Sequence, residues 1–162
     1  MMKIKYNNGT SEREIEVVNF YEDVAKLLVK EDVENGKRVI EINTMYGEVV
    51  YEVSNHMNGL VKIRELQNTM PDEYADEGLK HCYLFFSKFV NAEKHTFYEI
   101  TPRETDIIVS YGCKGDKNSM FSNPRTDSIP KRMYWIKKYE KLANGYADSE
   151  QLNFALKKKM LS

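Results

Sequence analysis

Residues 96–101 read Thr-Phe-Tyr-Glu-Ile-Thr, and residues 107–111, beyond a loop at residues 102–104 (Pro-Arg-Glu), read Ile-Ile-Val-Ser-Tyr. The first segment alternates as a β-strand does. The second is a run of β-branched and aromatic residues that ends at Gly112. The two segments predict consecutive strands of an antiparallel sheet in the second half of the chain.

The rest of the second half predicts one more strand and two helices. An aromatic-rich run at residues 80–90 is typical of a strand. A helix is expected from about residue 129 to residue 144, with Pro130 in its first turn and Gly145 as its stop. A final helix is expected after Asp148 or Ser149, with an apolar stripe of Leu152, Ala155, Leu156 and Met160.

The first half predicts a sheet with one covering helix. Strands are expected at residues 3–6, 14–17, 39–42, 49–53 and 60–66, because each segment is apolar or alternating and bounded by turn residues. Asn19 begins a helix that runs to about Glu31, in which the apolar residues fall at helical spacing. This order of elements favours an antiparallel sheet.

The predicted fold class is therefore α+β, with two small antiparallel-sheet units that are each covered by a helix, plus a carboxyl-terminal helix. Residues 1–67 form the first domain in this prediction, and residues 79–162 form the second. Residues 68–78 are polar and acidic and contain Pro71 and Gly78, which is typical of a linker.

The formal net charge of −1 is unevenly divided along the chain. Residues 1–80 carry 10 Lys and Arg against 16 Asp and Glu, a net charge of −6, and residues 81–162 carry 14 against 9, a net charge of +5. A basic half is typical of a protein that meets a polyanion. Attraction between the two halves, or ordinary solvated surfaces, explains the same asymmetry.

Three blocks of the second half, in order, resemble a known family. They are residues 95–100 (HTFYEI), residues 106–117 (DIIVSYGCKGDK) and residues 141–146 (KLANGY). Together they are similar to the WGR (Trp-Gly-Arg) domain, a small nucleic-acid-associated α+β module, over about residues 79–148. The resemblance implies a binding or sensing module rather than an enzyme. No stretch resembles the catalytic domain of the poly(ADP-ribose) polymerases that carry this domain.

The naming tripeptide of the family corresponds to Tyr111-Gly112-Cys113. The resemblance implies that the aromatic residue packs on a sugar or base at a nucleic-acid end, and Tyr111 keeps the flat ring that this requires. Gly112 keeps the close backbone approach. Cys113 cannot replace the fork of an arginine, so Lys114 and Lys117 are the expected phosphate contacts in the same loop.

Further basic candidates lie beyond this loop. Arg125, in an inserted-looking loop at residues 122–127, is expected to approach a phosphate. Lys137, Lys138 and Lys141 are expected on or near the outer side of the helix at residues 129–144. An ordinary solvated helix face is the alternative for these lysines.

Other function classes find little support. The three histidines, His56, His81 and His95, are far apart, so no metal site is expected. The first half contains no glycine-rich phosphate loop, no paired histidines and no nucleophile elbow. No cofactor is expected. No apolar run approaches the roughly 20 residues that cross a bilayer. The opening residues (MMKIK) lack a secretory signal, and we expect a cytoplasmic protein.

Three functional hypotheses follow. The first is a non-catalytic nucleic-acid-binding module with weak, salt-sensitive binding to DNA or RNA ends or backbone. The second is a protein-interaction or inhibitor module that keeps the same scaffold and meets a protein partner through the acidic first half. The third is a small enzyme that acts through Cys113 or a carboxylate group, because distant residues can meet in a fold.

Overall fold

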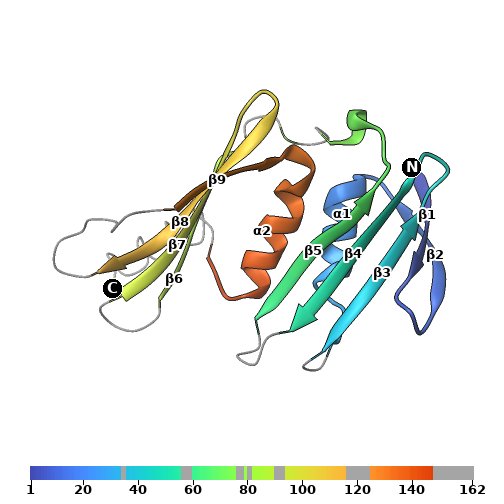
Figure 1. Cartoon of the computed structure of the whole chain (residues 1–162), viewed down its shortest axis with the longest axis horizontal. Helices are drawn as coiled ribbons and strands as arrows, with labels where there is room; N and C mark the ends of the chain where they lie inside the picture. The colour runs from blue at the N-terminus through green and yellow to red at the C-terminus, as the bar shows by residue number, and fades with distance from the viewer. Residues whose placement is uncertain are drawn as a thin grey trace, which may run out of the picture. The chain divides into compact units, whose positions relative to one another are not determined.

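The computed structural model describes residues 1–33, 36–55, 60–75, 79, 82–89, 94–115 and 125–147. The chain forms two units (Figure 1), and each contains an antiparallel sheet. The first unit consists of Met1–Gly78 with Trp135–Asn144, and the second of Leu79–Tyr134 with Gly145–Ser162. The predicted α+β class is confirmed. The first unit is built from two separate stretches of sequence, which the prediction lacked.

The first unit contains the five expected strands as one sheet in the order β2-β1-β3-β4-β5, with all neighbours antiparallel. The strands are β1 (Met2–Asn7), β2 (Glu12–Val17), β3 (Lys37–Asn43), β4 (Glu48–Asn55) and β5 (Val61–Asn68). The helix α1 (Phe20–Leu28) supplies the residues of its apolar stripe to the core. The core residues of this sheet and helix include Ile4, Tyr6, Phe20, Val24, Leu28, Ile40, Ile42 and Tyr51, each at most 1% exposed.

The helix α2 (Tyr134–Ala143) covers the free edge of β5. Asn144, just after the helix, accepts the Val61 N–H through Oδ1 at 2.7 Å and donates through Nδ2 to the Val61 carbonyl at 2.9 Å. Glu140 Oε2 accepts the Ile63 N–H at 2.9 Å. Exposed strand edges attract other chains. Here two side chains take the place of a further strand.

The carboxylate of Glu140 is buried, with only 4% of the residue exposed. Its Oε1 lies 3.8 Å from the ammonium of Lys137 and 3.7 Å from that of Lys141. The hydroxyl of Tyr139 donates to Glu22 of α1 at 3.0 Å, and burial, followed by this bond, raises the pKa of Tyr139 to about 12. These contacts fix α2 beside α1 within the first unit.

The second unit contains four strands in sequence order, β6 (Leu84–Phe89), β7 (Lys94–Pro102), β8 (Asp106–Gly115) and β9 (Arg125–Pro130), all antiparallel. Phe86, Ile100 and Ile107 are fully buried in it. The chain returns to this sheet after α2, because Ser87 and Ala147 exchange backbone hydrogen bonds of 3.0 and 2.9 Å. Gly145 permits the return with φ of 92°.

Two features of the second half differ from expectation. The helix begins at Tyr134 rather than near residue 129, because β9 and a 3-10 turn, η2 (Lys131–Met133), precede it. Pro130 ends the edge strand β9. Proline lacks a backbone N–H, and both an edge strand and the first turn of a helix tolerate that loss. The helix that we expected to cover the second sheet is assigned from Trp135 onward to the first unit. The expected final helix lies outside the described residues.

The segment expected as a linker, residues 68–78, is assigned to the first unit. Asn68 ends β5, and Met70 is only 8% exposed. The Thr69 N–H donates to the Glu48 carbonyl at 2.8 Å. A Cβ at Gly47 would stand 2.7 Å from the Thr69 carbonyl oxygen, so the β3–β4 turn requires glycine there. A 3-10 turn, η1 (Asp72–Tyr74), follows. No described helix is long and apolar enough to span a membrane.

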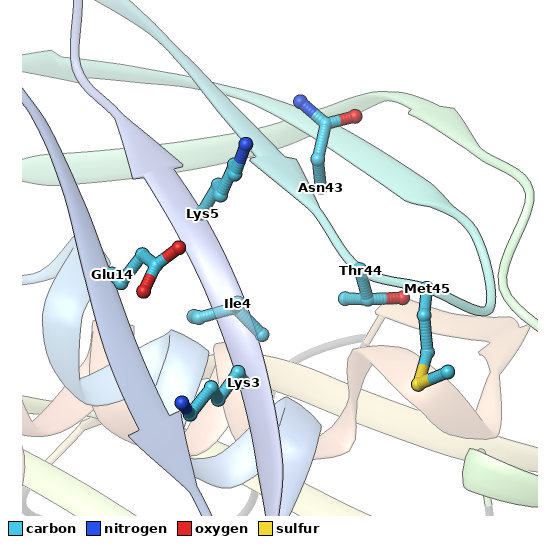
Figure 2. A pocket seen from close by; sticks show the side chains of 7 residues that line it. All are labelled: Lys3, Ile4, Lys5, Glu14, Asn43, Thr44 and Met45. Carbon is cyan, nitrogen blue, oxygen red and sulfur yellow. The ribbon is translucent and has the colours of Figure 1, made fainter.

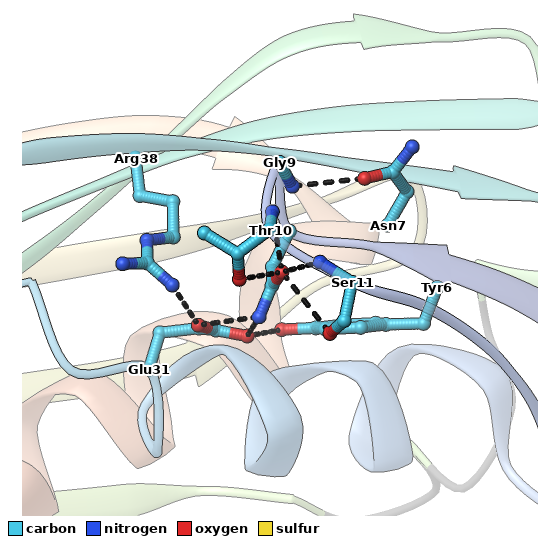
Figure 3. A network of polar contacts seen from close by, with 8 residues as sticks. Tyr6, Asn7, Gly9, Thr10, Ser11, Glu31 and Arg38 are labelled. Atoms are coloured by element: carbon cyan, nitrogen blue, oxygen red, sulfur yellow. Dashed lines mark hydrogen bonds and ion pairs between the residues drawn. The ribbon is translucent and has the colours of Figure 1, made fainter.

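A carboxylate joins the β1–β2 hairpin to the end of α1 (Figure 3). Glu31, with 8% of its side chain exposed, accepts the Tyr6 hydroxyl at 2.5 Å and lies 3.5 Å from Arg38. The Asn8 amide nitrogen lies 3.4 Å from both of its oxygens, and the Arg13 guanidinium lies over the Tyr6 ring, 5.5 Å from its centroid. Burial, and then the bond to Glu31, raises the pKa of Tyr6 far above its usual value of 10.0.

This raised pKa predicts a loss of stability in alkali. Above about pH 10 a tyrosine in the unfolded chain releases its proton, whereas Tyr6 in the folded chain keeps it, so the unfolded state becomes favoured as pH rises. We expect Tyr6→Phe to reduce this alkaline loss and to cost about 1 kcal/mol at neutral pH. Urea unfolding between about pH 8 and pH 11 measures both effects. The exposed Tyr46→Phe is the control, and an unchanged alkaline slope in Tyr6→Phe contradicts the prediction.

Candidate functional site

The candidate site lies where β7, β8 and β9 run side by side. Tyr111 of β8 is paired with Tyr98 of β7 on one side and with Arg125 of β9 on the other. Residues directly opposite each other in an antiparallel sheet share a face. Two tyrosines and an arginine therefore form a row across three strands.

The rings of Tyr98 and Tyr111 are stacked, with centroids 6.0 Å apart and planes inclined by 20°. Tyr98 is 6% exposed, whereas Tyr111 is half-buried. The Tyr111 hydroxyl donates to Asp127 Oδ2 at 3.0 Å. Tyr98 and Asp127 thus hold the Tyr111 ring at two places, while Arg125 and Asp127 are both exposed.

The structure describes only part of the segment that follows Tyr111, which contains the candidates Gly112, Lys114 and Lys117. Gly112 pairs with Phe97, which is 4% exposed and stacked on Phe85 at 6.0 Å between centroids. The backbone of Cys113 continues β8, and that of Lys114 pairs with His95. Lys117 lies outside the described residues.

The three helix lysines belong to the first unit, whereas this row belongs to the second. Lys137, Lys138 and Lys141 lie on α2 within the first unit. All three are half-buried. Lys137 and Lys141 flank Glu140, and burial lowers the pKa of Lys141. The ammonium of Lys138 lies 5.1 Å from the Trp135 ring centroid and 5.7 Å from that of Tyr139.

The structure therefore joins two of the predicted site residues, Tyr111 and Arg125, and adds two that sequence reasoning missed. Tyr98 appeared only as part of the strand pattern at residues 95–100. Asp127 carried no signal, because the loop expected at residues 122–127 gave it no position. Counting outward from the loop expected at residues 102–104 places Tyr98 opposite Ile108, and only the observed turn at residues 103–106 brings it opposite Tyr111.

Among the described residues, no three His, Cys, Asp or Glu side chains are grouped so as to hold a metal ion. Comparison with models of protein families, with curated proteins and with solved structures finds no match.

Proposed function

We propose that this protein is a non-catalytic nucleic-acid-binding module, similar to WGR domains, that contacts DNA or RNA ends or backbone through Tyr111 and Arg125. The pairing of these two residues across β8 and β9 carries the proposal. An aromatic ring stacks on a base or a sugar, and a guanidinium binds phosphate through charge-assisted hydrogen bonds. Arg125 supplies the cation that Cys113 lacks.

The surroundings of the pair set the expected strength of binding. Tyr98 and Asp127 orient the Tyr111 ring, which lowers the entropy lost when a base stacks on it. The Asp127 carboxylate also repels phosphate, so binding is weak and falls steeply as salt rises. Lys114, near the end of β8, and Lys117, which follows β8 in the sequence, remain candidate phosphate contacts of this proposal.

Replacing either member of the pair is expected to weaken nucleic-acid binding by about tenfold or more, as for the loss of one stacked base or one charged contact. Fluorescence anisotropy with 5′-phosphorylated duplex, nicked duplex and single strands measures the affinity of Tyr111→Ala and Arg125→Gln. For Arg125→Gln the slope of affinity against salt falls by about one. Tyr111→Phe keeps the ring and is expected to keep most of the affinity.

Arg64→Gln is the matched control, because Arg64 is an arginine of the first unit with 63% of its side chain exposed. Its loss removes the same charge and leaves binding almost unchanged. No binding to any of these nucleic acids at low salt ends the proposal. Unchanged affinity in Tyr111→Ala removes Tyr111 from it.

A protein-interaction role without nucleic-acid contact is the second candidate. The placement of the α2 lysines favours it, because Lys137 and Lys141 lie 3.8 and 3.7 Å from the Glu140 carboxylate, which offsets part of their charge. Under this alternative the wild-type protein and Arg125→Gln behave alike in the anisotropy series. The same experiment therefore separates the two candidates.

A further inference from the structure

Asp127 is an acidic residue in a site that is proposed to bind phosphate. It lies opposite Val109 of β8, two residues along each strand from the pair of Tyr111 and Arg125, and therefore on the same face of the sheet. Its Oδ2 accepts the Tyr111 hydroxyl at 3.0 Å. Asp127 is exposed, and its Oδ1 accepts no hydrogen bond from the described residues. One carboxylate oxygen is thus open to a ligand beside the Tyr111 ring.

Arg125 and Asp127 present opposite charges from one strand. Only Thr126 separates them, so their side chains leave the same face of β9 about 7 Å apart. Both are exposed, and no ion pair joins them within the part of the chain that the structure describes. The guanidinium and the carboxylate can therefore bind different groups of the same ligand.

A base reaches the Tyr111 ring from the β9 side. The Tyr98 ring of β7 is stacked against Tyr111, with centroids 6.0 Å apart. Arg125 and Asp127 stand on the other side, in β9. Because Asp127 binds the phenol hydroxyl, a base that stacks on the ring and extends past that hydroxyl has one edge beside the carboxylate.

A carboxylate selects among the bases by their hydrogen-bond donors. When ionised it only accepts, and its two oxygens can bind two donors at once. Guanine alone presents two adjacent N–H donors, at N1 and N2, on its Watson–Crick edge. Adenine and cytosine place an amino group beside a ring nitrogen that accepts, and thymine and uracil place one N–H between two carbonyl oxygens. Guanine is therefore the base that a carboxylate binds best.

We propose that this site prefers an unpaired guanine of a nucleic-acid strand, whose Watson–Crick edge is bound by Asp127. The base stacks on Tyr111 and its phosphate meets Arg125. The inference rests on the nucleic-acid binding proposed above and narrows its target. The bond from the Tyr111 hydroxyl occupies one acceptor position of Oδ2, and each carboxylate oxygen offers two, so both oxygens remain able to bind guanine.

The guanine must be unpaired because a duplex covers this edge. Base pairing uses the N1 and N2 donors, so a protein reaches them only in single strands, overhangs and loops. The same carboxylate repels phosphate. Asp127 thus lowers the affinity for every strand and supplies a difference between strands, which is what specificity requires.

The test is fluorescence anisotropy of the full chain with 5′-phosphorylated thymidine strands of about ten nucleotides. Each strand carries one guanine, inosine, adenine or 7-deazaguanine. Inosine lacks the N2 amino group, and the guanine strand is expected to bind about fivefold or more tightly than the inosine and adenine strands. The 7-deazaguanine strand keeps the Watson–Crick edge and is expected to bind as guanine does. Annealing a complementary strand is expected to abolish the preference, and the same series in RNA distinguishes the two nucleic acids.

Asp127→Asn separates the selection of the base from the orientation of the ring. The amide oxygen still accepts the Tyr111 hydroxyl, but an NH2 group replaces the second acceptor. The preference for guanine over inosine is therefore expected to disappear. Affinity for strands without guanine is expected to rise, because the repulsion of phosphate is lost. A purely structural role of Asp127 predicts no change in the ratio of the two affinities.

Glu14→Gln is the matched control, because it removes the same charge from an exposed position of the first unit. Glu14 lines a cavity of about 340 Å³ (Figure 2) beside Lys3 and Lys5, and no aromatic ring is among the side chains that line it. The guanine preference is expected to be unchanged in this variant.

Equal affinity for the guanine and inosine strands, in a chain that binds both, overturns the inference and leaves the proposed function standing. So does a preference that is lost with 7-deazaguanine, since N7 is then the atom that is recognised, or one that persists in Asp127→Asn. Absence of binding to every strand removes both the inference and the proposed function.

Discussion

A chain that ends at Gly78 is expected to lose the cooperative unfolding of the first unit, although it contains all five strands of the first sheet and α1. The fragment lacks Glu140 and Asn144, so the N–H groups of Val61 and Ile63 lose their acceptors. Water replaces these acceptors, so each lost hydrogen bond costs about 0.5–1.5 kcal/mol, and the loss of a fully buried apolar side chain of α2, such as Ile136, costs roughly 1.5–3 kcal/mol more. The sum is a large share of the roughly 5–15 kcal/mol that stabilises a typical domain.

Urea unfolding followed by circular dichroism compares the fragment of residues 1–78 with the full chain. A synthetic peptide of residues 130–147 is expected to restore a cooperative transition when added to the fragment. The same peptide carrying Glu140→Ala and Asn144→Ala is the matched control and is expected to fail. A fragment that unfolds at the same urea midpoint as the first unit of the full chain contradicts the assignment of α2.

In the full chain, Glu140→Ala is expected to destabilise the first unit by about 3–5 kcal/mol, the cost typical of removing one partner from a buried charged cluster. The substitution removes the acceptor of the Ile63 N–H and the counter-charge of Lys137 and Lys141. Glu140→Gln keeps an acceptor without the charge, so its stability is expected to lie between those of the wild-type chain and Glu140→Ala.

The stability lost in Glu140→Ala is also expected to depend on pH. Burial lowers the pKa of Lys141, and the Glu140 charge opposes that shift. Without Glu140 the folded chain binds fewer protons than the unfolded chain as pH approaches 10, so the variant regains part of its lost stability as pH rises. Denaturant unfolding of both proteins between about pH 7 and pH 10 measures this. Glu104→Ala, at an exposed loop position, is the control. If the difference in unfolding free energy between Glu140→Ala and the wild-type chain does not change with pH, the prediction for Lys141 is wrong.

The first sheet was predictable because its strands alternate. Ile40 and Ile42 face the core while Glu41 between them is exposed, and such a pattern defines both the strand and its buried face. β9 gave no such pattern. Its residues, RTDSIP, include a single aliphatic side chain and are almost all exposed, as suits an edge strand. Sequence periodicity detects burial, and β9 buries almost nothing.

The position of α2 was not predictable for a different reason. Its apolar spacing shows that one face of the helix is buried, but not which sheet covers it. Glu140 and Asn144 look like ordinary polar residues of a solvated helix end, and only the fold brings them to the backbone of β5. The lysines beside them were interpreted as a basic surface for the same reason.

The candidate site was predictable in its parts. Tyr111 and Arg125 were each named from the sequence. Their pairing depends on the register of β8 with β9, which follows from the position of an edge strand that the sequence does not mark.

The discontinuous first unit also has a consequence for the order of events during protein synthesis. Gly78 leaves the ribosome 66 residues ahead of Asn144. At roughly 5–20 residues per second this is an interval of about 3–13 s. During that time the edge of β5 is without its cover, and an uncovered edge recruits strands from other nascent chains. The part of the protein that is translated first is therefore completed last, and a slower ribosome lengthens the period in which it is open to misassembly.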